Sequence, residues 1–524
     1  MHSTVLFNDG WNFSKQPLGK SFEEMQKNVS EFSPVEIPHD WLIYNTNDLY
    51  ETSVGWYRKN FTVKLNEGEK ILIAFDGVYM DSTLFVNGKQ AGEWKYGYSQ
   101  FRFDITEFLK DGDNELILRV VHQSPNSRWY SGAGVYRNVW LITEPAAYLV
   151  TDGVYISTKC SEEENTKWTA YIDAEVSFNK KIAAADIKNY SVRQSVLVEG
   201  EMLVSSGISS PLSKTRIFNC YTGHEDYVYD TSIELPVKEP IEWDIDNPYQ
   251  YDLKTELLLG DKVVDEIVQK FGFRTIKYDT EEGFLLNGRK VKLHGVCLHH
   301  DLGALGSAFN KAAMRRQIEV MKKMGVNAIR TSHNMPAPGL MELCAEMGIL
   351  VDCEAFDMWV RPKTEFDYAR FFKTWARRDV GSWVRNFRNK PCVIMWSVGN
   401  EIYDTHADPE AVDITKKLSE YVYASDPRQN ARVTIGSNYM PWEGAQKCAD
   451  VYKLAGYNYA EKYYEQHHKA HPDWVIYGSE TASTLQSRGI YHFPLSQQIL
   501  ADDDEQCSSC NMRLRHLVRR ENLL

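Results

Sequence analysis

Two glutamates follow short apolar runs in the second half of the chain, and this setting favours acid–base chemistry on a sugar. Glu401 comes after the run 393–400, and Glu480 comes after the run 474–479, about eighty residues later. Such runs predict buried strands, and β/α barrels place catalytic groups at the carboxyl ends of their strands. Glycoside hydrolysis needs one carboxylic acid to protonate the leaving oxygen and one carboxylate facing the anomeric carbon. A single glutamate could instead cap a helix or pair with lysine, but two in this setting favour an enzyme.

Polar residues near these strand ends extend the candidate site. Asn400 precedes Glu401 and could hydrogen-bond a sugar hydroxyl next to the reacting centre. The sequence His299-His300-Asp301 could suggest a metal site. Adjacent residues of a strand point to opposite faces, however, so the two histidines cannot face one ion without a bulge. We therefore predict neither a metal nor another cofactor.

The chain from about residue 283 alternates between strand-like and helix-like segments, which predicts βα units around a parallel sheet. Helices are expected in the gaps between the strands, for example over Ala312–Met324, Ala337–Met347, Tyr368–Phe387 and Pro409–Ala424. The predicted strands are Lys290–Cys297, Val326–Thr331, Ile349–Cys353, Val393–Val398, Arg432–Ile435, Val451–Tyr457 and Trp474–Tyr477. A TIM barrel of type (β/α)8 has one strand more than this set, so we expect residues 278–524 to form a barrel that lacks strand eight.

The first half of the chain predicts two all-β domains. Within residues 1–148 the runs Ile71–Phe75, Leu84–Val86 and Glu115–Val121 predict strands, and Asn87-Gly88 predicts a hairpin turn. This pattern is typical of a β-sandwich or a jelly roll. Residues 149–277 continue with short strands at a spacing that predicts an immunoglobulin-like sandwich.

Composition narrows the classes of function. With 524 residues the chain should form two to four domains, and its net charge of -13 argues against nucleic-acid binding. Aromatic residues make up 13% of the chain, which suits carbohydrate binding and β-sandwich cores equally well. No signal peptide or apolar membrane span is visible, and the nine cysteines are scattered. We expect a cytoplasmic protein without a membrane partner.

Several segments, in order along the chain, resemble glycoside hydrolase family 2, the β-galactosidase and β-glucuronidase family. Residues 389–401 are similar to its acid/base signature, and residues 325–334 are similar to its second barrel strand. Residues 127–137 resemble the signature that closes its N-terminal sugar-binding jelly roll. The stretches 37–41 and 271–274 also fit the family.

The resemblance implies a retaining β-glycosidase that acts by double displacement on terminal β-linked sugars, with Glu480 as nucleophile and Glu401 as general acid/base. It favours β-D-galactosides as substrates and leaves a β-glucuronidase as the alternative. Arg330 would keep Glu480 ionised, because a neighbouring cation lowers the pKa of a carboxylate. Together with Asn400, the substrate-binding residues would be His299, Asp301, Arg330, His333 and Tyr459.

The chain departs from the family pattern in two places. Residues 354–361 lack the Glu-x-His of the magnesium-dependent branch, which further weakens the case for a metal. Beyond about Ser509 the sequence is basic and contains no eighth apolar strand, as expected of a frameshift or a fragment, although a short C-terminal helix is the alternative. An incomplete barrel exposes two strand edges, which favours association. The sequence thus leaves open a homo-oligomer and a catalytically impaired carbohydrate-binding fragment.

Overall fold

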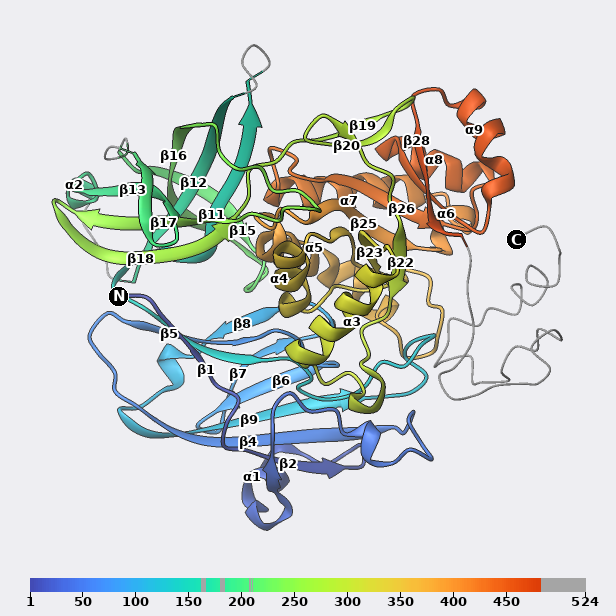
Figure 1. Cartoon of the computed structure of the whole chain (residues 1–524). Helices are drawn as coiled ribbons and strands as arrows, with labels where there is room; N and C mark the ends of the chain where they lie inside the picture. Colours follow the sequence, from blue (N-terminus) through green and yellow to red (C-terminus); the bar gives the residue numbers. More distant parts are fainter. Residues whose placement is uncertain (162–165, 180–183, 207–208, 210, 482–524) are drawn as a thin grey trace.

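A computed structural model describes residues 1–161, 166–179, 184–206, 209 and 211–481. The N-terminal unit (blue in Figure 1) contains two sheets and the helix α1 (Phe22–Lys27), which begins with a capping box between Ser21 and Glu24. One sheet has the strand order β1 (Ser3–Leu6), β10 (Val139–Glu144), β5 (Lys70–Phe75), β8 (Phe101–Asp104). The other has the order β3 (Ser33–Val35), β2 (Trp11–Gln16), β4 (Ser53–Val63), β9 (Gly112–His122), β6 (Ser82–Val86), β7 (Lys89–Trp94).

The hairpin between β6 and β7 turns at the predicted dipeptide. Val86 pairs with Lys89, so Asn87 and Gly88 form the two-residue loop. Both have positive φ, +48° and +83°. Such turns favour Asn-Gly because both central residues must adopt the left-handed region.

The second unit (green in Figure 1) contains two four-stranded antiparallel sheets around a core of its own, together with the short helix α2 (Ala184–Ile187). The first sheet has the order β11 (Ala147–Cys160), β12 (Lys167–Phe178), β16 (His224–Lys238), β15 (Ser213–Asn219). The second has the order β14 (Glu201–Ser205), β13 (Tyr190–Val198), β17 (Tyr251–Leu259), β18 (Lys262–Phe271). The predicted ranges 1–148, 149–277 and 278–524 stay predictions, and β11 crosses the first of these boundaries.

A small antiparallel sheet leads into the third unit, a parallel sheet of seven described strands with helices between them. The small sheet consists of β19 (Ile276–Asp279), β20 (Gly283–Leu286) and β21 (Arg289–Lys290). The parallel strands are β22 (Gly295–Leu298), β23 (Ala328–Thr331), β24 (Leu350–Glu354), β25 (Val393–Asn400), β26 (Arg432–Ser437), β27 (Leu454–Asn458) and β28 (Val475–Glu480). The helices are α3 (Lys311–Lys323), α4 (Pro338–Met347), α5 (Ala369–Phe387), α6 (Asp404–Ala407), α7 (Ala411–Ser425), α8 (Glu443–Tyr452) and α9 (Tyr464–Ala470).

The multidomain architecture and the parallel barrel sheet are confirmed, but two strands begin three or more residues later than predicted. The strand predicted over Lys290–Cys297 is interrupted, and the barrel strand begins only at Gly295. The strand predicted from Val451 begins at Leu454, because Val451 still lies in helix α8, which precedes this strand. Lys453 ends that helix in the left-handed region, at φ +58°. A short apolar run does not distinguish the end of a buried helix from the start of a strand. The predicted absence of strand eight concerns residues 482–524, which lie outside the described residues.

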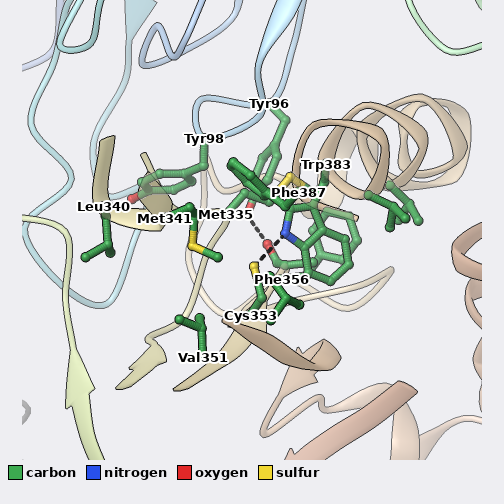
Figure 2. Packing of buried hydrophobic residues seen from close by; sticks show 14 of the residues in the cluster. Tyr96, Tyr98, Met335, Leu340, Met341, Val351, Cys353, Phe356, Trp383 and Phe387 are labelled. Atoms are coloured by element: carbon green, nitrogen blue, oxygen red, sulfur yellow. Dashed lines mark hydrogen bonds between the residues drawn. The ribbon is translucent and has the colours of Figure 1, made fainter. Parts of the chain in front are cut away.

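The N-terminal unit and the barrel share one hydrophobic core. Tyr96 and Tyr98 reach from the N-terminal unit into a cluster of barrel residues, and Trp383 donates a hydrogen bond to Cys353 in the same cluster (Figure 2). The hydroxyl of Tyr96 donates to the backbone carbonyl of Ala355, directly after β24. Because this packing fixes the first unit on the barrel, side chains of the first unit can contribute to a site at the strand ends. No helix among the described residues is long and apolar enough to cross a membrane.

Candidate active site

The carboxyl ends of the parallel strands bring most of the predicted site residues together. Glu480 is the last residue of β28, and Glu401 directly follows β25. Glu401 and Tyr459, which follows β27, have positive φ values of +46° and +53°. Non-glycine residues in the left-handed region are strained and are concentrated at functional sites. The backbone at these two strand ends is therefore shaped to aim particular side chains.

Glu480 is surrounded by hydrogen-bond donors. Nη1 of Arg330 donates to its Oε1 over 2.7 Å, and Nε2 of His333 lies 3.5 Å from the same oxygen. The hydroxyl of Tyr459 also hydrogen-bonds the carboxylate. Burial raises the pKa of Glu480 above its usual value, Arg330 and Tyr459 oppose this, and the negative charge of Glu401 adds to it. Arg330 thus has the expected effect on Glu480, but burial has the larger one.

Glu401 is held by a different set of groups. Nδ2 of Asn458 donates to its Oε1 over 3.1 Å, and Nη1 of Arg128 lies 3.4 Å from its Oε2. Ser479 fixes the orientation of Asn458 by donating to its Oδ1 over 2.5 Å. The backbone N–H of Glu401 donates to the carbonyl of Gly436 at the end of β26, over 2.8 Å. The two glutamates therefore lie at the same edge of the sheet in different electrostatic surroundings.

A buried carboxyl group, Glu354 at the end of β24, connects several predicted residues. Its Oε2 accepts hydrogen bonds from Arg330 over 2.6 Å and from Ser397 over 2.7 Å, and its Oε1 lies 2.7 Å from Nδ1 of His333. Burial raises the pKa of Glu354 to about 8, although Arg330 lowers it. The raised pKa favours a protonated Glu354 at neutral pH, and Arg330 lies between this carboxyl group and that of Glu480.

Asn400 is the last residue of β25 and is fully buried. Its Oδ1 accepts from Arg330 over 2.9 Å and from Asn458 over 3.0 Å, and its Nδ2 donates to Asp357 over 2.8 Å. These bonds position its neighbours. The predicted contact of Asn400 with a sugar hydroxyl stays a prediction.

The N-terminal unit supplies two side chains to the site. Arg128 makes a two-point ion pair with Asp357, over 3.0 and 2.7 Å, while also contacting Glu401. The centre of the Trp129 ring lies 4.5 Å from the centre of the His333 ring and 5.0 Å from the centre of the His299 ring. Segment 127–137 therefore closes the first unit and also forms one wall of the site.

Lys363 places a second cation against Asp357. Its side chain is fully buried, and Nζ donates to Oδ1 of Asp357 and to the carbonyl of Asn400, each over 2.8 Å. Burial, followed by the charge of Arg128, lowers the pKa of Lys363 to about 8. Within the described residues no group of three or more His, Cys, Asp or Glu side chains could hold a metal ion.

The side chains of His299 and His300, which follow β22, point to different surroundings, as the alternation of side chains along a strand predicts. His299 faces Trp129 and His333, whereas His300 contacts the backbone carbonyl of Ser131 over 2.9 Å. Burial lowers the pKa of His299 to about 4, so its imidazole is neutral at pH 7. Asp301 accepts a 3.4 Å hydrogen bond from the backbone of Gly303 in its own loop.

Several residues of this site were not among those predicted from the sequence: Arg128, Trp129, Glu354, Asp357, Lys363 and Asn458. Glu354 and Asn458 end strands in the same way as the two catalytic candidates, so examining the last residue of every strand could have found them. Arg128 and Trp129 lie in a segment that was noted only for its resemblance. Nothing in the local sequence marks Lys363.

Three sequence profiles of one family match consecutive parts of the chain. They are described as "Glycosyl hydrolases family 2, sugar binding domain" (residues 19–145), "Glycosyl hydrolases family 2" (residues 151–274) and "Glycosyl hydrolases family 2, TIM barrel domain" (residues 279–492).

Individual relatives agree with the profiles. The β-galactosidase BoGH2A of Bacteroides ovatus is 34% identical over 96% of this chain and 63% of its own length. A β-glucuronidase of Bacteroides fragilis is 26% identical over 81% of this chain and 59% of its own length. The crystal structure of a glycosyl hydrolase family 2 member from Bacteroides cellulosilyticus has a TM-score of 0.81 at 31% identity, covering 91% of this chain and 61% of that one. The chain thus spans less than two thirds of the length of these relatives.

Proposed function

Because the chain belongs to glycoside hydrolase family 2, we propose that it is a retaining β-glycosidase that releases terminal β-D-galactosyl residues. The observation that carries the proposal is that Glu401 and Glu480 lie at the carboxyl ends of β25 and β28 in one parallel sheet, each with its own set of donors. Retaining hydrolysis uses such a pair, one carboxyl group as proton donor and one as nucleophile.

In the first step an Oε atom of Glu480 attacks the anomeric carbon and forms an ester bond to it, while the glycosidic C–O bond breaks. Glu401 transfers its proton to the departing oxygen. In the second step Glu401 takes a proton from water, the water oxygen bonds to the anomeric carbon, and the carboxylate of Glu480 leaves. One water molecule is consumed, and the configuration at the anomeric carbon is retained.

The neighbours of each glutamate suit these roles. Arg330 and Tyr459 direct their donors at Glu480 and would stabilise its carboxylate, both before attack and as it departs. Asn458 and Arg128 hold opposite oxygens of Glu401 and fix its position. His299 and His333, beside Trp129, would contact the hydroxyls of the bound sugar.

The choice of sugar rests on similarity. The relative from B. ovatus, at 34% identity over nearly the whole chain, is a β-galactosidase, which favours galactosides. The second candidate is a β-glucuronidase, because the relative from B. fragilis carries that name at 26% identity. A panel of p-nitrophenyl β-D-glycosides distinguishes the two candidates, and we expect the highest kcat/KM with the galactoside.

Two variants test the catalytic roles. Glu480→Gln should lower kcat/KM roughly a thousandfold or more, because it removes the nucleophile. Azide should restore the activity of Glu401→Ala on an activated aryl glycoside, because azide can attack the glycosyl-enzyme without a general base. The expected product is a β-glycosyl azide. Glu342→Gln, at a surface ion pair on α4, is the isosteric control and should retain wild-type activity. Equal rates for wild type and Glu480→Gln would contradict the assignment, and sugar binding without turnover would favour a carbohydrate-binding fragment.

A further inference from the structure

The segments that follow β25 and β26 carry four rings that pack against one another, which we call the aromatic cluster: Tyr403, His406 (in α6), Tyr439 and Trp442. The ring of His406 lies 3.9 Å from that of Tyr439 at 31° and 5.1 Å from that of Trp442 at 78°. Tyr403 and Trp442 each pack edge-on to Tyr439, with ring centres 6.3 Å apart in both pairs. These four rings thus form a continuous row.

The row begins at the catalytic candidates. Tyr403 lies two residues after Glu401, and Nζ of Lys363 is 5.6 Å from the centre of its ring. The hydrogen bond from the backbone N–H of Glu401 to the carbonyl of Gly436 joins the two segments where they begin. Both loops leave the carboxyl edge of the sheet, where the substrate of a barrel enzyme binds.

The outer end of the row is exposed to solvent. Trp442 is 55% exposed, whereas the chain's other tryptophans, all of them described, are buried or only partly exposed. A tryptophan left in water forgoes the stabilisation that burial provides. An exposed ring that continues a row from the active site is therefore placed to bind a ligand rather than to stabilise the fold.

Two polar side-chain atoms in the same two segments have no hydrogen-bond partner among the described residues. Nδ1 of His406 and Oδ1 of Asn438 are buried and make no hydrogen bond with any described residue. Buried polar atoms nearly always have a partner, so each of these calls for a donor or acceptor from a bound molecule or water. Burial lowers the pKa of His406, so its imidazole is neutral at pH 7 and can either donate or accept.

We propose that the aromatic cluster is an aglycone subsite, where a sugar ring of a β-linked oligosaccharide stacks beyond the bond that is cleaved. A pyranose offers an apolar face for aromatic rings and a rim of hydroxyls for polar atoms without partners, and the cluster together with the adjacent Asn438 provides both. The subsite rests on the proposed function, because it assumes cleavage between Glu401 and Glu480. Its occupant is the leaving-group portion of an oligosaccharide, and Trp442 contacts the part farthest from the cleaved bond.

The test compares substrates of increasing length on the full chain. The substrates are methyl β-D-galactoside and β-D-galactosides extended by one, two and three further sugar residues. Trp442→Ala should leave kcat/KM for the methyl glycoside unchanged and lower it about tenfold for the longer substrates that reach the ring. Trp442→Phe should restore most of the loss. Tyr227→Ala, at a 56% exposed aromatic residue in β16, is the matched control and should have no effect at any length.

Calorimetric titration of the oligosaccharides into Glu480→Gln, with and without Trp442→Ala, separates the subsite from the catalytic assignment. Weaker binding of the longer sugars by the double variant supports the subsite even where hydrolysis of every galactoside is absent. Equal binding of the longer sugars by Glu480→Gln and by the double variant overturns the subsite. An equal loss of kcat/KM in Trp442→Ala for substrates of every length overturns it as well. Absence of turnover with all glycosides, by contrast, counts against the proposed function alone.

Discussion

Glu354 decides the charge and the hydrogen-bond directions around the proposed nucleophile. Its Oε2 accepts from Arg330 and Ser397, so the proton that it holds below about pH 8 resides on Oε1. That proton is donated to Nδ1 of His333, which places the ring hydrogen of His333 on Nε2, the atom 3.5 Å from Glu480. Ionised Glu354 would accept from Nδ1 instead and leave Nε2 without its hydrogen.

The pH–rate profile tests this arrangement. We expect kcat/KM of the wild type to fall above about pH 8, where Glu354 ionises. Glu354→Gln keeps an acceptor for Arg330 and a permanent donor for His333, so it should be active and should lack this fall. An alkaline limb that is the same in the variant would assign it to another group.

Arg128 is the second residue whose role can be tested singly. It bonds two oxygens of Asp357 and contacts Glu401, a geometry that a lysine cannot reproduce. We expect Arg128→Gln to lower kcat/KM roughly a hundredfold, because small displacements of a catalytic group are costly. Arg128→Lys should recover only part of the loss. Arg315→Gln, at an exposed ion pair on α3, should remain at wild-type activity, and a normal rate for both Arg128 variants would contradict the role.

At the scale of elements, segment 127–137 joins the N-terminal unit to the barrel at both of its ends. Arg128 reaches the site, and the buried Arg137 donates to the carbonyls of Met335 and Pro336 over 2.9 and 3.2 Å. Arg137 also donates over 2.8 Å to the carbonyl of Tyr98 in its own unit. One guanidinium therefore satisfies backbone oxygens of both units.

Replacing Arg137 should weaken this junction. Arg137→Met leaves several buried carbonyls unpaired, and we expect it to lower the free energy of unfolding by about 3 kcal/mol. Thermal denaturation followed by circular dichroism measures the loss. Arg289→Met, at an exposed pair with Asp244, is the control and should change stability little. A loss no greater than that of the control would show that the junction does not depend on Arg137.

At the scale of the whole molecule, buried carboxyl groups make stability depend on pH. Burial raises the pKa of Asp379 to about 7 and that of Glu354 to about 8, well above the usual values near 4. Between about pH 4, where these groups titrate in the unfolded state, and about pH 8, the folded state binds more protons than the unfolded state. The free energy of unfolding therefore falls as the pH rises over this range. His39 and His299, whose pKa values burial lowers to about 4, have the opposite effect, but only up to about pH 6.5.

Above pH 6.5 the carboxyl groups therefore act without opposition from these histidines. We expect the Tm to fall between pH 6.5 and 8, because above about pH 8 the lowered pKa of Lys363 has the opposite effect. Differential scanning calorimetry across this range checks the expectation. Asp379→Asn and Glu354→Gln should each reduce the slope. A Tm that stays constant or rises over the interval would rule out these groups as the source.

The sequence by itself determined the strand ends and the two glutamates that follow them. Apolar runs, turn dipeptides and family signatures are local, so Glu401, Glu480 and the Asn87-Gly88 hairpin could be predicted from a few neighbouring residues each. The same local character explains the error at Val451, where one apolar run contains the end of a helix and the start of a strand.

Only the tertiary structure decided which side chains surround the glutamates and which of them hold protons. Arg128 meets Glu401 across 273 residues of sequence, and Glu354 meets Arg330 and His333 from neighbouring strands. The pKa of Glu354 is set by burial, which no single segment determines. Such contacts arise only when separate elements pack together. Packing fixes the distances between the side chains and excludes the water that would otherwise stabilise their charged forms.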